Sequence, residues 1–77
     1  MVFEIAPRIT VDKNVRFGRP VIKGTRVPVT VVLEELAAGM TVDEIVQEYG
    51  ITRGDVLAVL QYAARLVGEE EIYAVAR

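Results

Sequence analysis

The sequence predicts a mainly α-helical fold with a small N-terminal β arm and a helix-turn-helix-like core of three helices. Two observations lead to this fold class. Short β-prone triplets, separated by turn residues, occupy the first third of the 77-residue chain. After Pro28, apolar residues recur at helical spacing, in segments bounded by capping residues and glycines. We expect a single domain over residues 1–77, made of a β arm or hairpin (1–29), a helical core (30–67) and a tail (68–77).

The arm contains a short β segment and a predicted hairpin. The β segment is Ile9-Thr10-Val11. In the hairpin, Pro20-Val21-Ile22 and Thr25-Arg26-Val27 are separated by Lys23-Gly24. A two-residue connection with glycine is typical of tight hairpins because glycine accepts the positive φ that such turns require. The arm is too small to be stable by itself, so we expect it to pack on the helices or on another chain.

Local signals bound the first two helices. The first is expected over about 30–38, with Gly39 as the residue that stops it. The second begins at a capping box, in which Thr41 and Glu44 exchange hydrogen bonds with each other's backbone, and it ends at Gly50. Each carries an apolar stripe at helical spacing, and these stripes predict the faces that pack into the core.

The third helix is expected to begin after Thr52, a favourable capping residue, with Asp55 in its first turn. We expect it to run to Gly68. The tail that follows is open to three interpretations: a frayed helix, a strand, or a segment that becomes ordered on a partner.

The second and third helices have the spacing of a helix-turn-helix. Such a motif needs glycine in the turn, an apolar residue directly after it, and apolar residues that face the core. Those positions are filled by Val46, Gly50, Ile51, Val56 and Val59. A plain helical hairpin needs much the same pattern. The outer positions of the third helix are Arg53, Gly54, Leu57, Ala58 and Gln61, of which only Arg53 and Gln61 resemble base readers.

The composition predicts self-association. Hydrophobic residues make up 52% of the chain, and there is no cysteine for a disulfide to stabilise so small a core. The third helix is apolar almost all round, which indicates burial on more than one side. We therefore expect a homo-oligomer whose interface includes Leu57, Leu60 and Ala64. The two phenylalanines and three tyrosines are expected in the core or at an interface.

Several function classes find no support in the sequence. The chain lacks histidine, cysteine and serine, and it has no phosphate-binding glycine loop followed by Lys-Ser or Lys-Thr. We expect no enzyme activity, no metal and no cofactor. No segment is long and apolar enough for a membrane span, and no signal-peptide pattern is present. We expect a cytoplasmic protein without a membrane partner.

Charge is unevenly distributed along the chain. Residues 1–26 carry six cations against two carboxylates, a net charge of +4, whereas residues 27–77 carry three against nine, a net charge of −6. This asymmetry predicts a binding surface. The candidate residues for binding a partner or a nucleic acid form a group that we call the basic arm: Arg16, Arg19, Lys23, Arg26 and Arg53.

The string GRPVIKGTRVPV at residues 18–29 resembles a known family, the domain of unknown function 433 (DUF433). The family pattern G-x-P-x-I-x-G-T-R-[IV]-x-V is matched by Gly18, Pro20, Ile22, Gly24, Thr25, Arg26, Val27 and Val29. The Ala38-Gly39 pair, the T-x-x-E-I box and the Gln-Tyr-Ala of the last helix are also similar, so the resemblance covers about residues 8–67. It implies a helix-turn-helix-like fold. It also implies an antitoxin role in a toxin–antitoxin system, because members are frequently paired with a PIN-like nuclease.

Three hypotheses follow for function. The first is a non-enzymatic antitoxin-like protein that binds and neutralises a PIN-like nuclease toxin, with arginines that pair with the carboxylates of its metal site. The second is a dimeric helix-turn-helix transcriptional regulator whose basic arm binds DNA phosphates. The third is a dimerisation module with neither activity. The role of Arg26 stays open between a contact to a partner and an ion pair within the fold, for example with Glu34 or Glu35.

Overall fold

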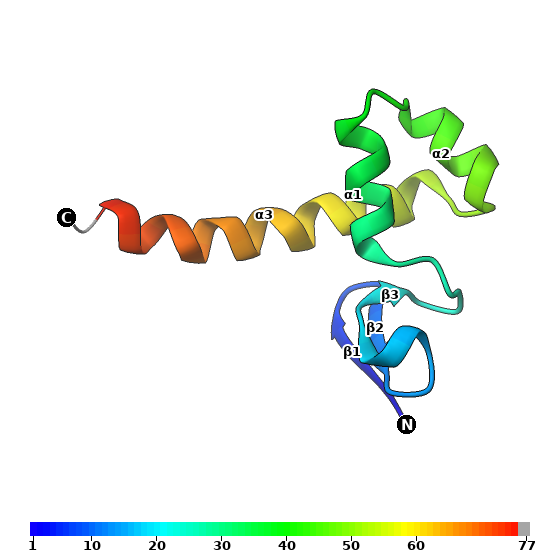
Figure 1. Cartoon of the computed structure of the whole chain (residues 1–77), viewed down its shortest axis with the longest axis horizontal. Coiled ribbons are helices and arrows are strands. Elements are labelled where there is room, and N and C mark those ends of the chain that lie inside the picture. The colour runs from blue at the N-terminus through cyan, green and yellow to red at the C-terminus, as the bar shows by residue number, and fades with distance from the viewer. Residues whose placement is uncertain (76–77) are drawn as a thin grey trace.

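The computed structural model describes the backbone of residues 1–75 and the side chains of residues 1–69. A small antiparallel sheet lies beneath three helices, and the last helix is a long rod that projects past the others (Figure 1). The predicted fold class is confirmed. The elements in chain order are β1 (Val2–Ala6), β2 (Ile9–Asp12), the 3₁₀ turn η1 (Arg16–Gly18), β3 (Val21–Ile22), α1 (Val29–Ala37), α2 (Val42–Tyr49) and α3 (Arg53–Val75).

The sheet has the order β1-β2-β3, and all its pairs are antiparallel. In the first pair Phe3 lies opposite Val11, and in the second Ile9 lies opposite Ile22. The strand β1 was not foreseen as a separate element, although it falls within the predicted arm. Its side chains are mostly exposed. Its sequence therefore lacks the strict alternation of apolar and polar residues that predicts a half-buried strand.

The hairpin predicted within residues 20–27 forms only in part. The turn is present: Gly24 has φ 77°, and the N–H of Thr25 donates to the carbonyl of Ile22 at 3.0 Å. The expected second strand is reduced to one antiparallel bridge between Val21 and Pro28, with the N–H of Ile22 donating to the carbonyl of Val27 at 3.0 Å, while β3 also pairs with β2. The Thr25 hydroxyl explains the difference, since it donates to the carbonyl of Ile22 at 2.7 Å and accepts from the N–H of Val27 at 3.0 Å.

The boundaries of α1 and α2 follow the local signals closely. The Thr41 hydroxyl accepts from the N–H of Glu44 at 3.1 Å, and the Glu44 carboxylate accepts from the N–H of Thr41 at 2.8 Å. These bonds form the predicted capping box. The hydrogen bonds from the Thr41 backbone and hydroxyl hold the pKa of Glu44 below its ordinary value of 4.5. At the other end of α2, Gly50 has φ 64°, a conformation that favours glycine.

The first turn of α3 has a reciprocal cap of the same kind. The Thr52 hydroxyl accepts from the N–H of Asp55 at 3.1 Å, and the Asp55 carboxylate accepts from the N–H of Thr52 at 3.0 Å. The predicted end at Gly68 is wrong, because the helix continues to Val75. Gly68 does not have a positive φ, and glycine inside a helix costs only about 1 kcal/mol. The residues of the predicted tail that the structure describes therefore belong to the helix.

The core joins the sheet to all three helices. Val32, Ile45, Val56 and Val59 are fully buried, and they meet Ile9 and Ile22 from the sheet. The small arm thus packs on the helices, as a two- or three-stranded sheet of this size requires. Within the described residues, no helix is long and apolar enough to cross a membrane.

Candidate functional site

The basic arm divides into paired and unpaired cations. The Lys23 ammonium lies 2.9 Å from the carboxylate of Glu4, and the guanidinium of Arg53 lies 3.6 Å from that of Asp43. Hydrogen bonds from Lys23 and from the N–H of Arg8, together with the positive charge of Lys23, hold the pKa of Glu4 below its ordinary value of 4.5. Two of the five candidate cations therefore have a carboxylate partner within the protein.

The other three cations, Arg16, Arg19 and Arg26, have no carboxylate within 4.0 Å among residues 1–69. Neither Glu34 nor Glu35 forms the ion pair that the sequence left open for Arg26. Arg26 contributes to the fold through its backbone instead, because its carbonyl accepts a hydrogen bond from Nε of Arg16 at 3.2 Å. The three arginines are exposed and together form the unpaired part of the basic arm.

Arg16 and Phe17 form an unusual left-handed turn in η1. Their φ angles are 50° and 57°, followed by 80° at Gly18. For residues with a Cβ, this conformation costs roughly 1–2 kcal/mol each. Backbone hydrogen bonds retain it: the N–H of Gly18 donates to the carbonyl of Val15, and the N–H of Arg19 donates to that of Arg16, both at 3.1 Å. The Phe17 side chain is 97% exposed, so the turn presents it to solvent.

Arg8 lies outside the basic arm, and the sequence did not indicate a role for it. It occupies the turn between β1 and β2 with φ 66°. Its Nη1 donates to the Thr52 hydroxyl and to the Asp55 carboxylate, both at 3.4 Å, and its guanidinium lies against Gly54. Arg8 therefore ties the β1–β2 turn to the first turn of α3.

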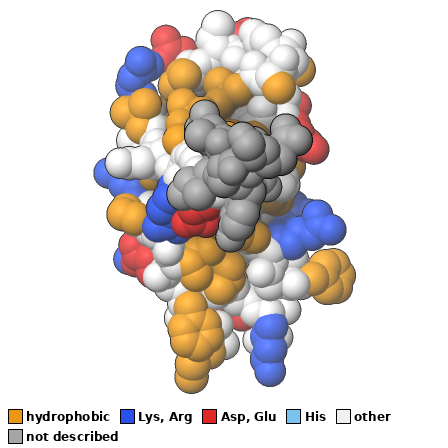
Figure 2. Space-filling model, turned by 90° about the vertical axis from the view of Figure 1, so that its left-hand side faces the viewer, with side chains coloured by type: hydrophobic (Ala, Val, Ile, Leu, Met, Phe, Trp, Pro, Cys, Tyr) orange, Lys and Arg blue, Asp and Glu red, His pale blue; other side chains and the backbone are white. Residues whose placement is uncertain are grey.

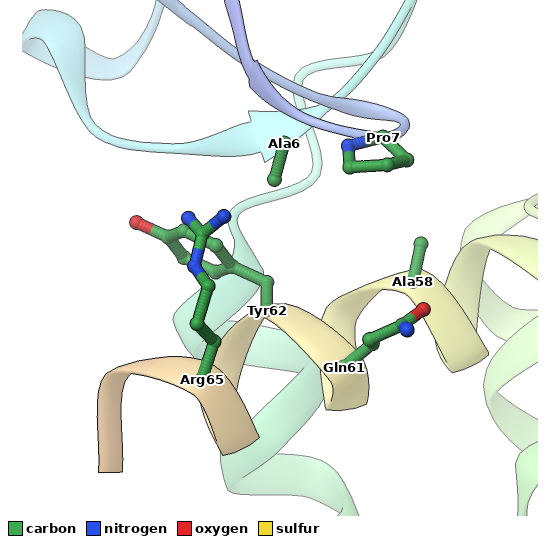
Figure 3. Close-up of a pocket in the computed structure, with 6 residues that line it drawn as sticks. All are labelled: Ala6, Pro7, Ala58, Gln61, Tyr62 and Arg65. Carbon is green, nitrogen blue, oxygen red and sulfur yellow. The ribbon is translucent and has the colours of Figure 1, made fainter. Parts of the chain in front are cut away.

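The β1–β2 turn lies along the face of α3 that a helix-turn-helix would present to DNA. In Figure 3, Ala6 at the end of β1 and Pro7 of this turn face α3 across a hollow of about 320 Å³. From the helix, Ala58, Gln61, Tyr62 and Arg65 line the same hollow. The guanidinium of Arg65 stacks over the Tyr62 ring, 5.6 Å from its centroid. Gly54 and Ala58 are thus partly covered by the turn, whereas Gln61 stays exposed beside it.

The second apolar face of α3 is exposed within the single chain. Leu57 is 53% exposed and Leu60 is 40% exposed, and Ala64 is also at the surface. Val67, which the sequence analysis did not single out, is 60% exposed and continues the same stripe. Spacings of three, four and three residues place these four side chains on one side of the helix. Figure 2 views the molecule from the side on which α3 projects, and hydrophobic side chains are exposed around the helix end.

These features define a class of protein: a small helix-turn-helix-like domain with an exposed apolar helix face and a β arm, whose Arg16, Arg19 and Arg26 have no carboxylate partner in residues 1–69. The family model described as "Protein of unknown function (DUF433)" matches residues 9–63, and the chain belongs to this family. The match includes β2, η1, β3, α1, α2 and the first half of α3, whereas β1 lies outside it.

The fold also occurs in a solved structure, the X-ray crystal structure of Rv2018 from Mycobacterium tuberculosis. The two share 33% sequence identity with a TM-score of 0.63. The similarity covers 68% of this chain and 24% of that one, so this chain corresponds to about a quarter of Rv2018. No protein with curated annotation matches the sequence.

Proposed function

We propose that the protein is a non-enzymatic antitoxin-like protein that binds and neutralises a PIN-like nuclease. The observation that carries the proposal is the set of three exposed arginines, Arg16, Arg19 and Arg26, without a carboxylate partner in residues 1–69. A PIN-like nuclease holds its metal with clustered carboxylates. Guanidinium groups pair with carboxylates through two parallel N–H···O bonds. Arginines that enter such a cluster neutralise the charge that holds the metal.

Self-association is the second part of the proposal. Two copies of the chain would pack their α3 helices through Leu57, Leu60, Ala64 and Val67 and bury apolar surface that one chain leaves exposed. The basic arm lies at the other side of the molecule from the projecting half of α3 (Figure 1). A dimer built through α3 would therefore leave both basic arms free for partners.

Arg26→Ala tests the first part. The probe is the PIN-like protein encoded next to the gene for this chain or, failing that, each PIN-like protein of the same genome. Because the Arg26 side chain makes no ion pair in the described residues, we expect the variant to melt like the wild type. Nuclease inhibition should weaken by about 2 kcal/mol or more, roughly 30-fold, since a carboxylate in the partner loses its counter-charge.

Arg65→Ala is the matched control, because it removes the same charge from α3 and leaves the basic arm intact. It should inhibit as well as the wild type. A loss of inhibition by Arg26→Ala that its melting shift fully explains would end the claim for a direct contact.

DNA binding is the second candidate function, and the same three arginines favour it, because phosphates attract them as carboxylates do. The position of the β1–β2 turn beside Gly54 and Ala58 argues for contact through the arm and against base reading by α3. We expect roughly micromolar, weakly selective binding whose affinity falls steeply with salt. Nanomolar, sequence-selective binding by the isolated protein would instead favour a transcriptional regulator.

A further inference from the structure

Phe17 combines three properties that a structural residue does not need. It is 97% exposed, it adopts a left-handed backbone conformation with φ 57°, and it has Arg16 and Arg19 on either side of its turn. Its side chain is not part of the hydrophobic core. Aromatic residues and arginines are the residue types that most often dominate the binding energy at protein interfaces.

A shallow hollow lies next to the turn that carries Phe17. This hollow of about 410 Å³ is lined by Arg16, Phe17 and Arg19 together with Pro28, which caps α1, and Val31 and Glu34 of α1. Phe17 does not fill this hollow, because almost all of its surface meets solvent. The Phe17 ring therefore protrudes from the surface beside a shallow hollow. A partner that buries this ring has to provide a pocket for it.

We propose that Phe17 is the anchor with which this protein binds the nuclease. The ring enters an apolar pocket of an acidic protein surface, and Arg16 and Arg19 pair with carboxylates at the rim of that pocket. This inference rests on the proposed function and names the residue that fixes the position of the arginines. The left-handed turn supports it, because a strained conformation that exposes an aromatic ring is retained where the ring has a use.

Two other occupants fit the surface less well. A second copy of this chain would have to offer an apolar pocket with carboxylates and no cation at its rim, but the three hollows described for residues 1–69 each include a cation: Arg65, Lys13, or Arg16 with Arg19. Single-stranded nucleic acid binds to rows of aromatic side chains along a cationic groove. Here a single ring stands beside apolar Pro28 and Val31, without a second aromatic side chain in the same hollow.

Phe17→Asn tests the proposal without disturbing the fold. Asparagine tolerates the left-handed conformation better than phenylalanine does, so the variant should melt at the same temperature as the wild type or above it. With the PIN-like protein named above as the probe, calorimetry should show a dissociation constant raised by about 30-fold or more, the loss expected of a dominant interface residue.

Phe3→Ala is the matched control, because Phe3 is 58% exposed on β1 and lies outside the turn. It should bind the nuclease as the wild type does. If Phe17→Asn binds within about twofold of the wild type while the wild type binds tightly, the anchor is refuted and the proposed function stands.

If the wild type binds none of the PIN-like proteins, both proposals fail. A poly-thymidine oligonucleotide provides the last comparison. Loss of its binding in Phe17→Asn, with nuclease binding unchanged, would assign the ring to nucleic acid and overturn the anchor.

Discussion

The guanidinium of Arg8 lies against the Cα of Gly54, so a Cβ at position 54 would collide with it. Arg8 reaches this place from the turn between β1 and β2 and also contacts Thr52 and Asp55. The contact connects the β arm to the first turn of α3, beside the surface that a DNA-reading helix would use. Position 54 therefore favours glycine, because a residue without a Cβ leaves room for the Arg8 guanidinium.

This contact predicts an energetic coupling between Arg8 and Gly54. Alanine at position 54 favours the helix by up to about 1 kcal/mol but pushes Arg8 away from Thr52 and Asp55. In the Arg8→Ala background that second effect disappears. We expect Gly54→Ala to be more favourable in the Arg8→Ala protein than in the wild type by about 0.5–1 kcal/mol. Urea unfolding of the four proteins measures the difference, and additive effects would contradict the contact.

The exposed stripe on α3 predicts a dimer or higher oligomer. Because Leu60 is 40% exposed in the single chain, Leu60→Glu should dissociate the oligomer without unfolding the protein. Sedimentation at micromolar concentration measures the mass, with circular dichroism as the check on folding. Gln47→Glu, an exposed position on α2, adds the same charge outside the stripe and should leave the mass unchanged. A wild-type protein that sediments as a folded monomer of 8.5 kDa would refute this prediction.

Two glycines predict opposite responses to substitution. Gly24 has φ 77° in the turn after β3, so Gly24→Val should lower the free energy of unfolding by about 1–2 kcal/mol or more. Gly68 lies within α3 with no positive φ, and a Cβ there would meet no atom within 4 Å. Gly68→Ala should raise the free energy of unfolding by about 0.5–1 kcal/mol. Denaturant unfolding measures both changes, and equal effects at the two sites would contradict the assignment of Gly24 to the turn.

The lowered pKa values of Glu4 and Glu44 predict a loss of stability in acid. Each carboxylate binds its proton less readily in the folded chain than at its ordinary pKa of 4.5. Its contribution is therefore complete above that pH and is lost as the pH falls through the lowered pKa. In the double variant Glu4→Gln, Glu44→Gln, neither side chain titrates. Melting temperatures between about pH 6 and about pH 3 should fall less steeply for this variant than for the wild type. Parallel curves would show that neither carboxylate contributes.

The sequence was sufficient for most local structure. The capping box at Thr41, the cap at Thr52 and the stops at Gly39 and Gly50 depend on residues three or four positions apart, and the structure has all of them. The apolar period also predicted the buried face of each helix. The end of α3 was missed because Gly68 resembles a stop signal, and only the backbone conformation shows that it is not one.

By itself, then, the sequence determined the order of the three helices, the caps of α2 and α3 and the surplus of apolar surface on α3. Tertiary structure decided which cations are neutralised. Lys23 meets Glu4 and Arg8 meets Asp55 across separations of 19 and 47 residues, whereas Arg16, Arg19 and Arg26 meet no carboxylate in residues 1–69. It also decided that Phe17 faces solvent. The physical reason is that caps and turns depend on near neighbours in the chain, whereas charge pairing and burial depend on segments that only the folded chain brings together.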